Sequence, residues 1–295
     1  MRNYSLNIAG YKIRFENNSD ETDIIPSQRF SKYISTEIEY DFLIRIHKGK
    51  IIPPDNAVKV FDAPHIVEIN NIRIKKSDGF WSVFQDRDDL FITVTFPDPD
   101  EKRSALLKFS LHNREWDLRI DNPGKSFDPM EYPLDGLILY YLTVISGDIM
   151  IHGSGVNYKG NGYLFSGISG KGKTTMAKLW DNHGAEIIHD DRLIIRKTTT
   201  GYSMYNTPVY RNDEPRKSDI STIFLIGHGA ENEIIPVRGA SAISMVMANC
   251  IQHNWDPGII KGLIETISQI CATIPVYQLL FKPDSSIIEY LLKNE

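Results

Sequence analysis

Apolar and polar residues alternate along the first part of the chain. A period of two over about four to eight residues is typical of half-buried β-strands. It occurs at Tyr11, Ile13 and Phe15; at Phe42, Ile44 and Ile46; at Val67 and Ile69; and at Phe91, Val94 and Phe96. Turn-forming residues separate these runs at Asn17 to Asp20, Lys48 to Lys50, Ser77 to Gly79 and Pro97 to Asp100. The pattern therefore predicts a β-rich first part.

The pattern changes near Asn122-Pro123-Gly124, and apolar runs of helical and strand type then alternate. Helices are predicted over Pro133–Ser146, Lys173–His183, Ser241–Gln252, Ile259–Ala272 and Ser285–Leu292. Strands are predicted at Ile149–Ile151, Tyr163–Phe165, Glu186–Ile188, Leu193–Ile195, Ile223–Ile226 and Val276–Phe281. We therefore predict two domains, a β-rich domain over residues 1–128 and an α/β domain over residues 129–295.

Composition narrows the class of protein. The chain has 295 residues, 41% of them hydrophobic and 24% charged, which excludes a disordered chain. A net charge of −5 and the lack of a basic stripe with aromatic residues give no support to binding of nucleic acid or of an anionic membrane. The longest apolar run, Leu137 to Ile145, is too short to span a bilayer.

The N-terminus lacks the apolar run of a signal peptide, so a cytoplasmic location is expected. Cys250 and Cys271 form no CxxC pair, so neither a disulfide framework nor a cysteine-based zinc site is expected. The sequence leaves a homo-oligomer open.

The residues Gly167 to Thr174 read GISGKGKT and match the phosphate-binding pattern G-x-x-x-x-G-K-[ST] between a predicted strand and a predicted helix. Glycines let backbone N–H groups surround phosphate oxygens, and the helix N-terminus adds positive potential. Lys173 is expected to reach the β- and γ-phosphates of ATP, and the hydroxyl of Thr174 to hold Mg²⁺. The expected nucleotide-binding residues are Gly167, Ser169, Gly170, Lys171, Gly172, Lys173, Thr174 and Thr175. The alternative is a glycine-rich turn without a ligand.

Two further features are candidates for phosphoryl-transfer chemistry, which needs a group to take the proton of the acceptor. Asp190 and Asp191 are expected at the end of the strand that follows the loop's helix, and a solvated turn is the alternative. His152 is expected on the strand beside the loop's strand, and a core histidine is the alternative. The flanking Gly153 and Gly155 would permit close approach of backbone or ligand. A structural role is expected for His183, His189, His228 and His253.

Taken in order, the blocks HGSGV at His152, GISGKGKT at Gly167 and IIHDDR at Ile187 resemble the catalytic domain of HPr serine kinase/phosphorylase, whose P-loop is of the phosphoenolpyruvate-carboxykinase type. The resemblance is clear over residues 148–196 and diffuse to about residue 292. It implies an α/β P-loop fold after the β-rich region, and ATP and Mg²⁺ as cofactors. In the resemblance, Asp190 takes the proton of a serine hydroxyl, His152 assists at the reacting phosphate, Lys173 is catalytic, and Thr174 and Asp191 bind the metal.

The chain also departs from that family. The family's glycine-rich signature after the two aspartates, which carries a metal-binding glutamate, is absent, and residues 206–215 read NTPVYRNDEP. Arg211, Asp213 and Glu214 are the candidates to replace that glutamate, and phosphorylase activity is not implied. A kinase for serine of a protein or peptide is the leading hypothesis. The alternatives are a kinase for a small metabolite such as free serine, and a nucleotide-responsive regulatory protein without turnover.

Overall fold

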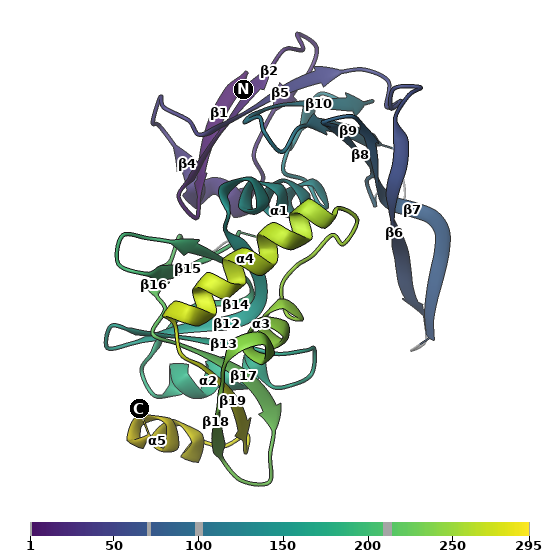
Figure 1. The fold of residues 1–295 in the computed structure, drawn as a ribbon. Coiled ribbons are helices and arrows are strands. Elements are labelled where there is room, and N and C mark those ends of the chain that lie inside the picture. The colour runs from purple at the N-terminus through teal and green to yellow at the C-terminus, as the bar shows by residue number, and fades with distance from the viewer. Residues whose placement is uncertain (1, 70–71, 98–102, 209–213, 295) are drawn as a thin grey trace. The chain divides into compact units, whose positions relative to one another are not determined.

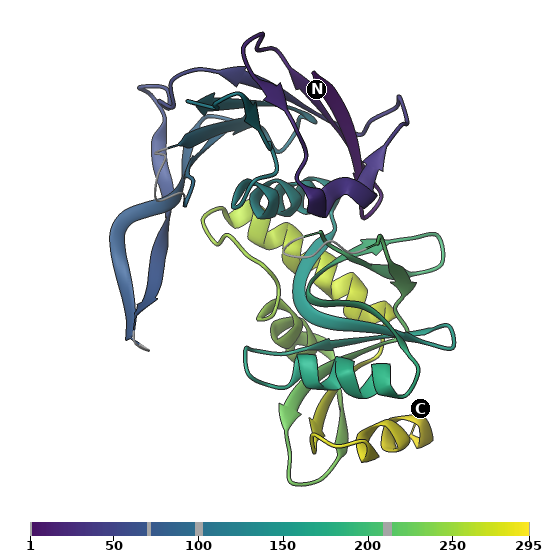
Figure 2. The ribbon, with the colours of Figure 1, turned by 180° about the vertical axis from the view of Figure 1, so that it is seen from behind.

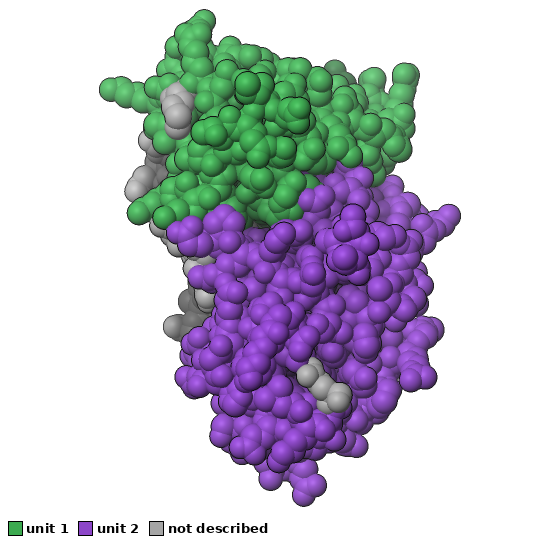
Figure 3. All heavy atoms as spheres, turned by 90° about the vertical axis from the view of Figure 1, so that its left-hand side faces the viewer, with its two compact units in different colours: residues 1–141, 208–213 green, residues 142–207, 214–295 purple. Residues whose placement is uncertain are grey.

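The computed structural model describes residues 2–69, 72–97, 103–208 and 214–294. The chain divides into two compact units, one of residues 1–141 and 208–213 and one of residues 142–207 and 214–295 (Figure 3). The division falls inside a helix, downstream of the boundary at residue 128 that the sequence suggests. Each unit is described by itself.

The first unit is built of strands, followed by one helix that crosses the division (Figure 1). Its elements are β1 (Asn3–Ile8), β2 (Tyr11–Asn17), β3 (Asp23–Ile24), the 3₁₀ helix η1 (Gln28–Tyr33), β4 (Ile34–Ser35), β5 (Phe42–Lys48), β6 (Val58–Ile69), β7 (Ile72–Asp86), β8 (Asp89–Thr95), β9 (Ser104–Phe109), β10 (Glu115–Asp121), β11 (Ser126–Phe127) and α1 (Leu134–Ser146). Within the described residues, the main sheet has the order β4-β1-β2-β5-β10-β9-β8-β7-β6. The residues of β2 that alternate in the sequence, Tyr11, Ile13 and Phe15, are all buried, as their period predicts.

The turn predicted at Ser77 to Gly79 is wrong, because β7 runs through it without a break. The register between β6 and β7 shifts opposite this stretch. Turn-type residues are therefore accommodated in an irregularity of the strand, and the pairing of the flanking residues with β6 overrides the local preference. Most of the turn predicted at Pro97 to Asp100 lies outside the described residues.

The second unit is a mixed α/β sheet with helices on both faces (Figures 1 and 2). Its elements are β12 (Ile149–Tyr158), β13 (Asn161–Ser166), α2 (Lys173–Asn182), β14 (Glu186–Lys197), β15 (Tyr202–Asn206), β16 (Lys217–Asp219), β17 (Thr222–His228), β18 (Glu233–Val237), α3 (Gly239–Met247), α4 (Pro257–Thr273), β19 (Val276–Phe281) and α5 (Ser286–Lys293). In the part of the chain that the structure describes, the strand order is β16-β15-β14-β12-β13-β17-β19-β18.

Alternate side chains of this sheet enter two separate cores. Leu164 packs in the cluster that contains residues of α3 and α4, such as Ile267. Its neighbours Tyr163 and Phe165 pack in the cluster that contains Trp180 of α2 and residues of α5. The period of two along β13 therefore determines which helices cover each face of the sheet. The strands and helices of this unit confirm the α/β fold class expected from the sequence.

Helix α3 ends at Met247, although helical spacing of apolar residues continues toward Gln252. The segment after it pairs with β12 instead, because His152 N donates to Asn249 O at 2.9 Å and Ile251 N donates to Met150 O at 2.8 Å. Helix α2 ends where the sequence predicts, before Gly184, whose φ of +88° is the left-handed conformation that glycine favours. Among the described residues, no helix is both long and apolar enough to cross a membrane.

Candidate active site

The loop Gly167–Thr174 connects the end of β13 to the start of α2. Gly170 and Gly172 have φ values of +82° and +93°, in the region where a Cβ atom is strained. A Cβ on Gly172 would also lie 2.9 Å from Cζ of Phe281. Gly172 is the N-cap of α2, and no side chain caps that helix end. The backbone N–H groups of the first turn are therefore the donors that a phosphate could accept from.

Three carbonyl groups of the loop are already engaged by donors. Lys173 Nζ donates to Gly167 O at 2.6 Å and to Ile168 O at 3.3 Å. His228 Nε2 lies 3.0 Å from Gly170 O, a contact in which Nε2 must carry the proton. Sequence patterns do not single out His228, because the contact joins residues far apart in the chain. Lys171 N also donates to Ile168 O at 3.3 Å, so the N–H groups at the start of α2, rather than that of Lys171, are the candidate donors to a phosphate.

Lys173 lies in the electrostatic field of the two aspartates. Burial lowers the pKa of Lys173, while the negative charges of Asp190 and Asp191 act to raise it. The lysine of the loop and the two carboxylates, distant in the sequence, are thus brought together.

The two aspartates lie within a strand rather than at its end. The sequence predicts separate strands on either side of them, but β14 is continuous from Glu186 to Lys197. Asp190 pairs with Ser154 and Asp191 with Gly153 on the neighbouring β12, and Gly153 pairs in turn with Ser166 of β13. One row across the sheet therefore joins Asp191 to the residue that precedes the loop. The pairing of both aspartates with β12 explains why an acidic pair does not interrupt β14.

His152 lies beside Asp191. The His152 Nδ1 and Asp191 Oδ1 atoms are 3.7 Å apart, and the two side chains are 44% and 38% exposed. Arg192 Nε approaches the other oxygen of Asp191 at 3.8 Å. Burial acts to raise the pKa of Asp191, but the contact with His152 and the charge of Arg192 lower it further than burial raises it. Asp191 is therefore held as a carboxylate, the form that a cation requires.

The glycines beside His152 serve packing. A Cβ on Gly153 would lie 2.9 Å from Cδ1 of Leu164, and a Cβ on Gly155 would lie 2.6 Å from Sδ of Met204. The close approach that the sequence allows at these positions is made by core side chains of the protein itself.

The donor set fits Mg²⁺ held together with nucleotide phosphates. Within the described residues, no cluster of three or more His, Cys, Asp or Glu side chains could hold a metal ion. Mg²⁺ bound to nucleotide needs only one or two protein oxygen ligands besides the phosphates and water. Thr174 in the first turn of α2 and the carboxylate of Asp191 are oxygen ligands of this kind. Of the candidates to replace the family's glutamate, Arg211 and Asp213 lie outside the described residues, and Glu214 accepts a hydrogen bond from Asn206 through its backbone carbonyl.

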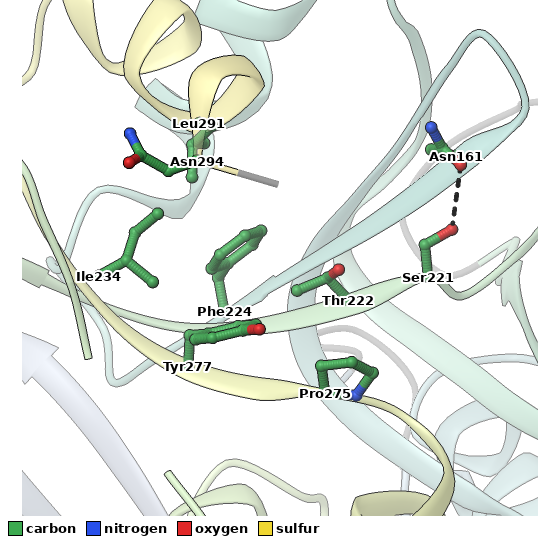
Figure 4. Close-up of a pocket in the computed structure, with 9 residues that line it drawn as sticks. All are labelled: Asn161, Ser221, Thr222, Phe224, Ile234, Pro275, Tyr277, Leu291 and Asn294. Carbon is green, nitrogen blue, oxygen red and sulfur yellow. Dashed lines mark hydrogen bonds between the residues drawn. The ribbon is translucent and has the colours of Figure 1, made fainter. Parts of the chain in front are cut away.

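A separate pocket lies at the opposite end of the same strands (Figure 4). Its cavity volume is about 280 Å³, and its lining includes Asn161, the first residue of β13, and Thr222, the first residue of β17. The loop follows the last residue of β13, so this pocket contains none of the predicted site residues.

Comparison with known proteins adds little to this picture. No family model matches the chain, and no curated protein matches it. Among solved structures, the chain is similar to the Hpr(Ser) kinase/phosphatase from Coxiella burnetii, with 13% sequence identity and a TM-score of 0.30 over 49% of this chain and 94% of that chain. That protein is of the kind the sequence motifs resemble, but a likeness of this size carries no argument about function, so the assignment rests on the geometry of the site.

Proposed function

We propose that this protein is an ATP-dependent kinase that transfers the γ-phosphate to a hydroxyl group, with serine of a protein or peptide as the acceptor. One observation carries the proposal. A glycine-rich loop with a lysine at the start of a helix lies within electrostatic reach of two carboxylates on a neighbouring part of the sheet. Opposite charges gathered beside a glycine-rich loop at a helix N-terminus are typical of a functional site.

Each residue has a role that follows from its chemistry. The N–H groups of the loop, from Gly167 to Thr175, and the ammonium group of Lys173 hold the phosphates. Thr174 and Asp191 hold Mg²⁺, which neutralises charge on the phosphates when it is bound. His152 contacts Asp191, and its proposed role is to assist at the reacting phosphate.

Asp190 acts as the general base in the transfer step. It takes the proton of the acceptor hydroxyl as the acceptor oxygen forms a bond to the γ-phosphorus, and the bond from that phosphorus to the β,γ-bridging oxygen breaks. ADP carries away the electron pair, so the products are a phosphate monoester, ADP and a proton on the carboxyl group.

The proposal is tested with the purified protein, Mg²⁺ and ATP labelled on the γ-phosphate, offered to lysate proteins and separately to free serine. We expect label on a protein or peptide, its loss in Asp190→Asn, and loss of ATP binding in Lys173→Ala. Lys178→Ala is the matched control, since Lys178 is an exposed lysine of the same helix.

Other outcomes identify the alternatives. Label on free serine alone would favour a metabolite kinase. Tight ATP binding without transfer to any acceptor, together with full biological activity of Asp190→Asn, would overturn the kinase proposal in favour of a nucleotide-responsive regulator.

A further inference from the structure

A buried serine contacts the proposed base. Ser154 lies in β12 with 0% of its surface exposed, directly opposite Asp190 of β14. Its Oγ donates a hydrogen bond to Oδ1 of Asp190. Because a buried hydroxyl without a partner is costly, this bond also satisfies Ser154.

The bond by itself is not evidence of function, because the same arrangement occurs elsewhere in the sheet. Ser203 of β15 is 2% exposed, lies opposite Asp219 of β16, and donates to Oδ1 of that carboxylate. The difference lies in the surroundings of the carboxylate. Asp190 adjoins Asp191, whose row across the sheet passes through Gly153 to Ser166, the residue that precedes the loop.

We propose that Ser154 is a positioning residue that fixes Asp190 for proton transfer, an inference that rests on the proposed function. Its hydroxyl engages Oδ1 and so holds the carboxylate in one orientation, which assigns Oδ2 to the proton of the acceptor. Ser154 thus aims the base at the acceptor hydroxyl.

The test compares Ser154→Ala with Ser203→Ala, which removes the equivalent bond away from the loop. In Ser154→Ala we expect kcat for Mg²⁺-ATP turnover to fall about tenfold, which corresponds to about 1.4 kcal/mol. We expect the KM for ATP to stay the same, because the loop is untouched. In Ser203→Ala, kcat should match the wild type, and Ser154→Thr, which keeps the hydroxyl, should recover part of the rate.

The split between kcat and KM separates positioning of the base from a merely structural role. An unchanged kcat in Ser154→Ala, or an equal fall of kcat in both alanine variants, would overturn the role of Ser154. Absence of phosphoryl transfer in the wild type would instead overturn the proposed kinase.

Discussion

The conformation of the loop can be tested at Gly172, where two separate constraints exclude a side chain. Its φ is +93°, and a Cβ atom would lie 2.9 Å from Cζ of Phe281. Gly184, at the other end of the same helix, has a similar φ of +88° but nothing within 4 Å of its Cβ position. Alanine at these two positions therefore separates backbone strain from steric overlap.

The expected magnitudes follow from these two constraints. A left-handed conformation costs a residue with a Cβ about 1–2 kcal/mol, and this is the whole effect expected for Gly184→Ala. Overpacking against Phe281 adds about 1–3 kcal/mol, so Gly172→Ala is expected to lose about 2–5 kcal/mol of unfolding free energy. Relief of the overlap displaces the N-terminus of α2, and ATP affinity should fall at least tenfold in Gly172→Ala and remain unchanged in Gly184→Ala.

The assay combines urea unfolding with calorimetric titration of Mg²⁺-ATP. The double variant Gly172→Ala with Phe281→Leu removes the overlap and leaves the strain. Its loss of unfolding free energy should therefore be about 1–3 kcal/mol smaller than the sum of the losses of the two single variants. The reasoning is refuted if Gly172→Ala is no less stable than Gly184→Ala and binds ATP as the wild type does.

Three further results are expected. His228→Ala should raise the KM for ATP about threefold to tenfold with kcat unchanged, since one hydrogen bond to the loop is lost, and His228→Gln should keep the wild-type value if the amide replaces the donor. Asp256→Ala should lower the unfolding free energy by about 1 kcal/mol in urea titrations, because Asp256 Oδ1 caps α4 by accepting from Ile259 N at 2.8 Å. His152→Ala removes a contact that lowers the pKa of Asp191, so that pKa should rise. A carboxylate with a lowered pKa stabilises the fold above its unfolded pKa, and this stabilisation is lost as the pH falls through its folded pKa. The loss of unfolding free energy in His152→Ala should be below about 1 kcal/mol, because both side chains are partly exposed. That loss should become smaller at acid pH. An equal deficit at every pH would contradict this last prediction.

The sequence predicts most of the elements of the second unit because each of them has a strong local signal. Helix α2 is bounded by the loop glycines before it and by Gly184 after it, and both ends agree with the structure. Strand β13 is a short apolar run, and its neighbour β12 begins with the apolar run Ile149–Ile151 that predicts it. The same local signals locate the loop residues Gly167 to Thr174, which follow β13, and His152, which lies in β12.

The errors occur where non-local pairing overrides a local preference. Asp190 and Asp191 are poor strand formers, yet they lie inside β14 because they pair with Ser154 and Gly153 of β12. The contact of His228 with the loop and that of Ser154 with Asp190 each join residues far apart in the chain. Periodicity describes one element at a time, so it cannot indicate such contacts.

The way β13 ends explains how the loop leaves the sheet beside the carboxylates. β13 pairs with β12 only as far as Ser166, opposite Gly153, and the loop then departs. The residues of β12 that precede Gly153 have no partner in β13. The segment Asn249–Ile251 pairs with them instead, from His152 to Met150. β12 therefore stays hydrogen-bonded past the point where the loop leaves, and it continues to hold His152 and its pairing with β14 in place. The segment after α3, which carries none of the predicted site residues, is thus what allows a phosphate-type loop and an acidic strand to lie on either side of His152.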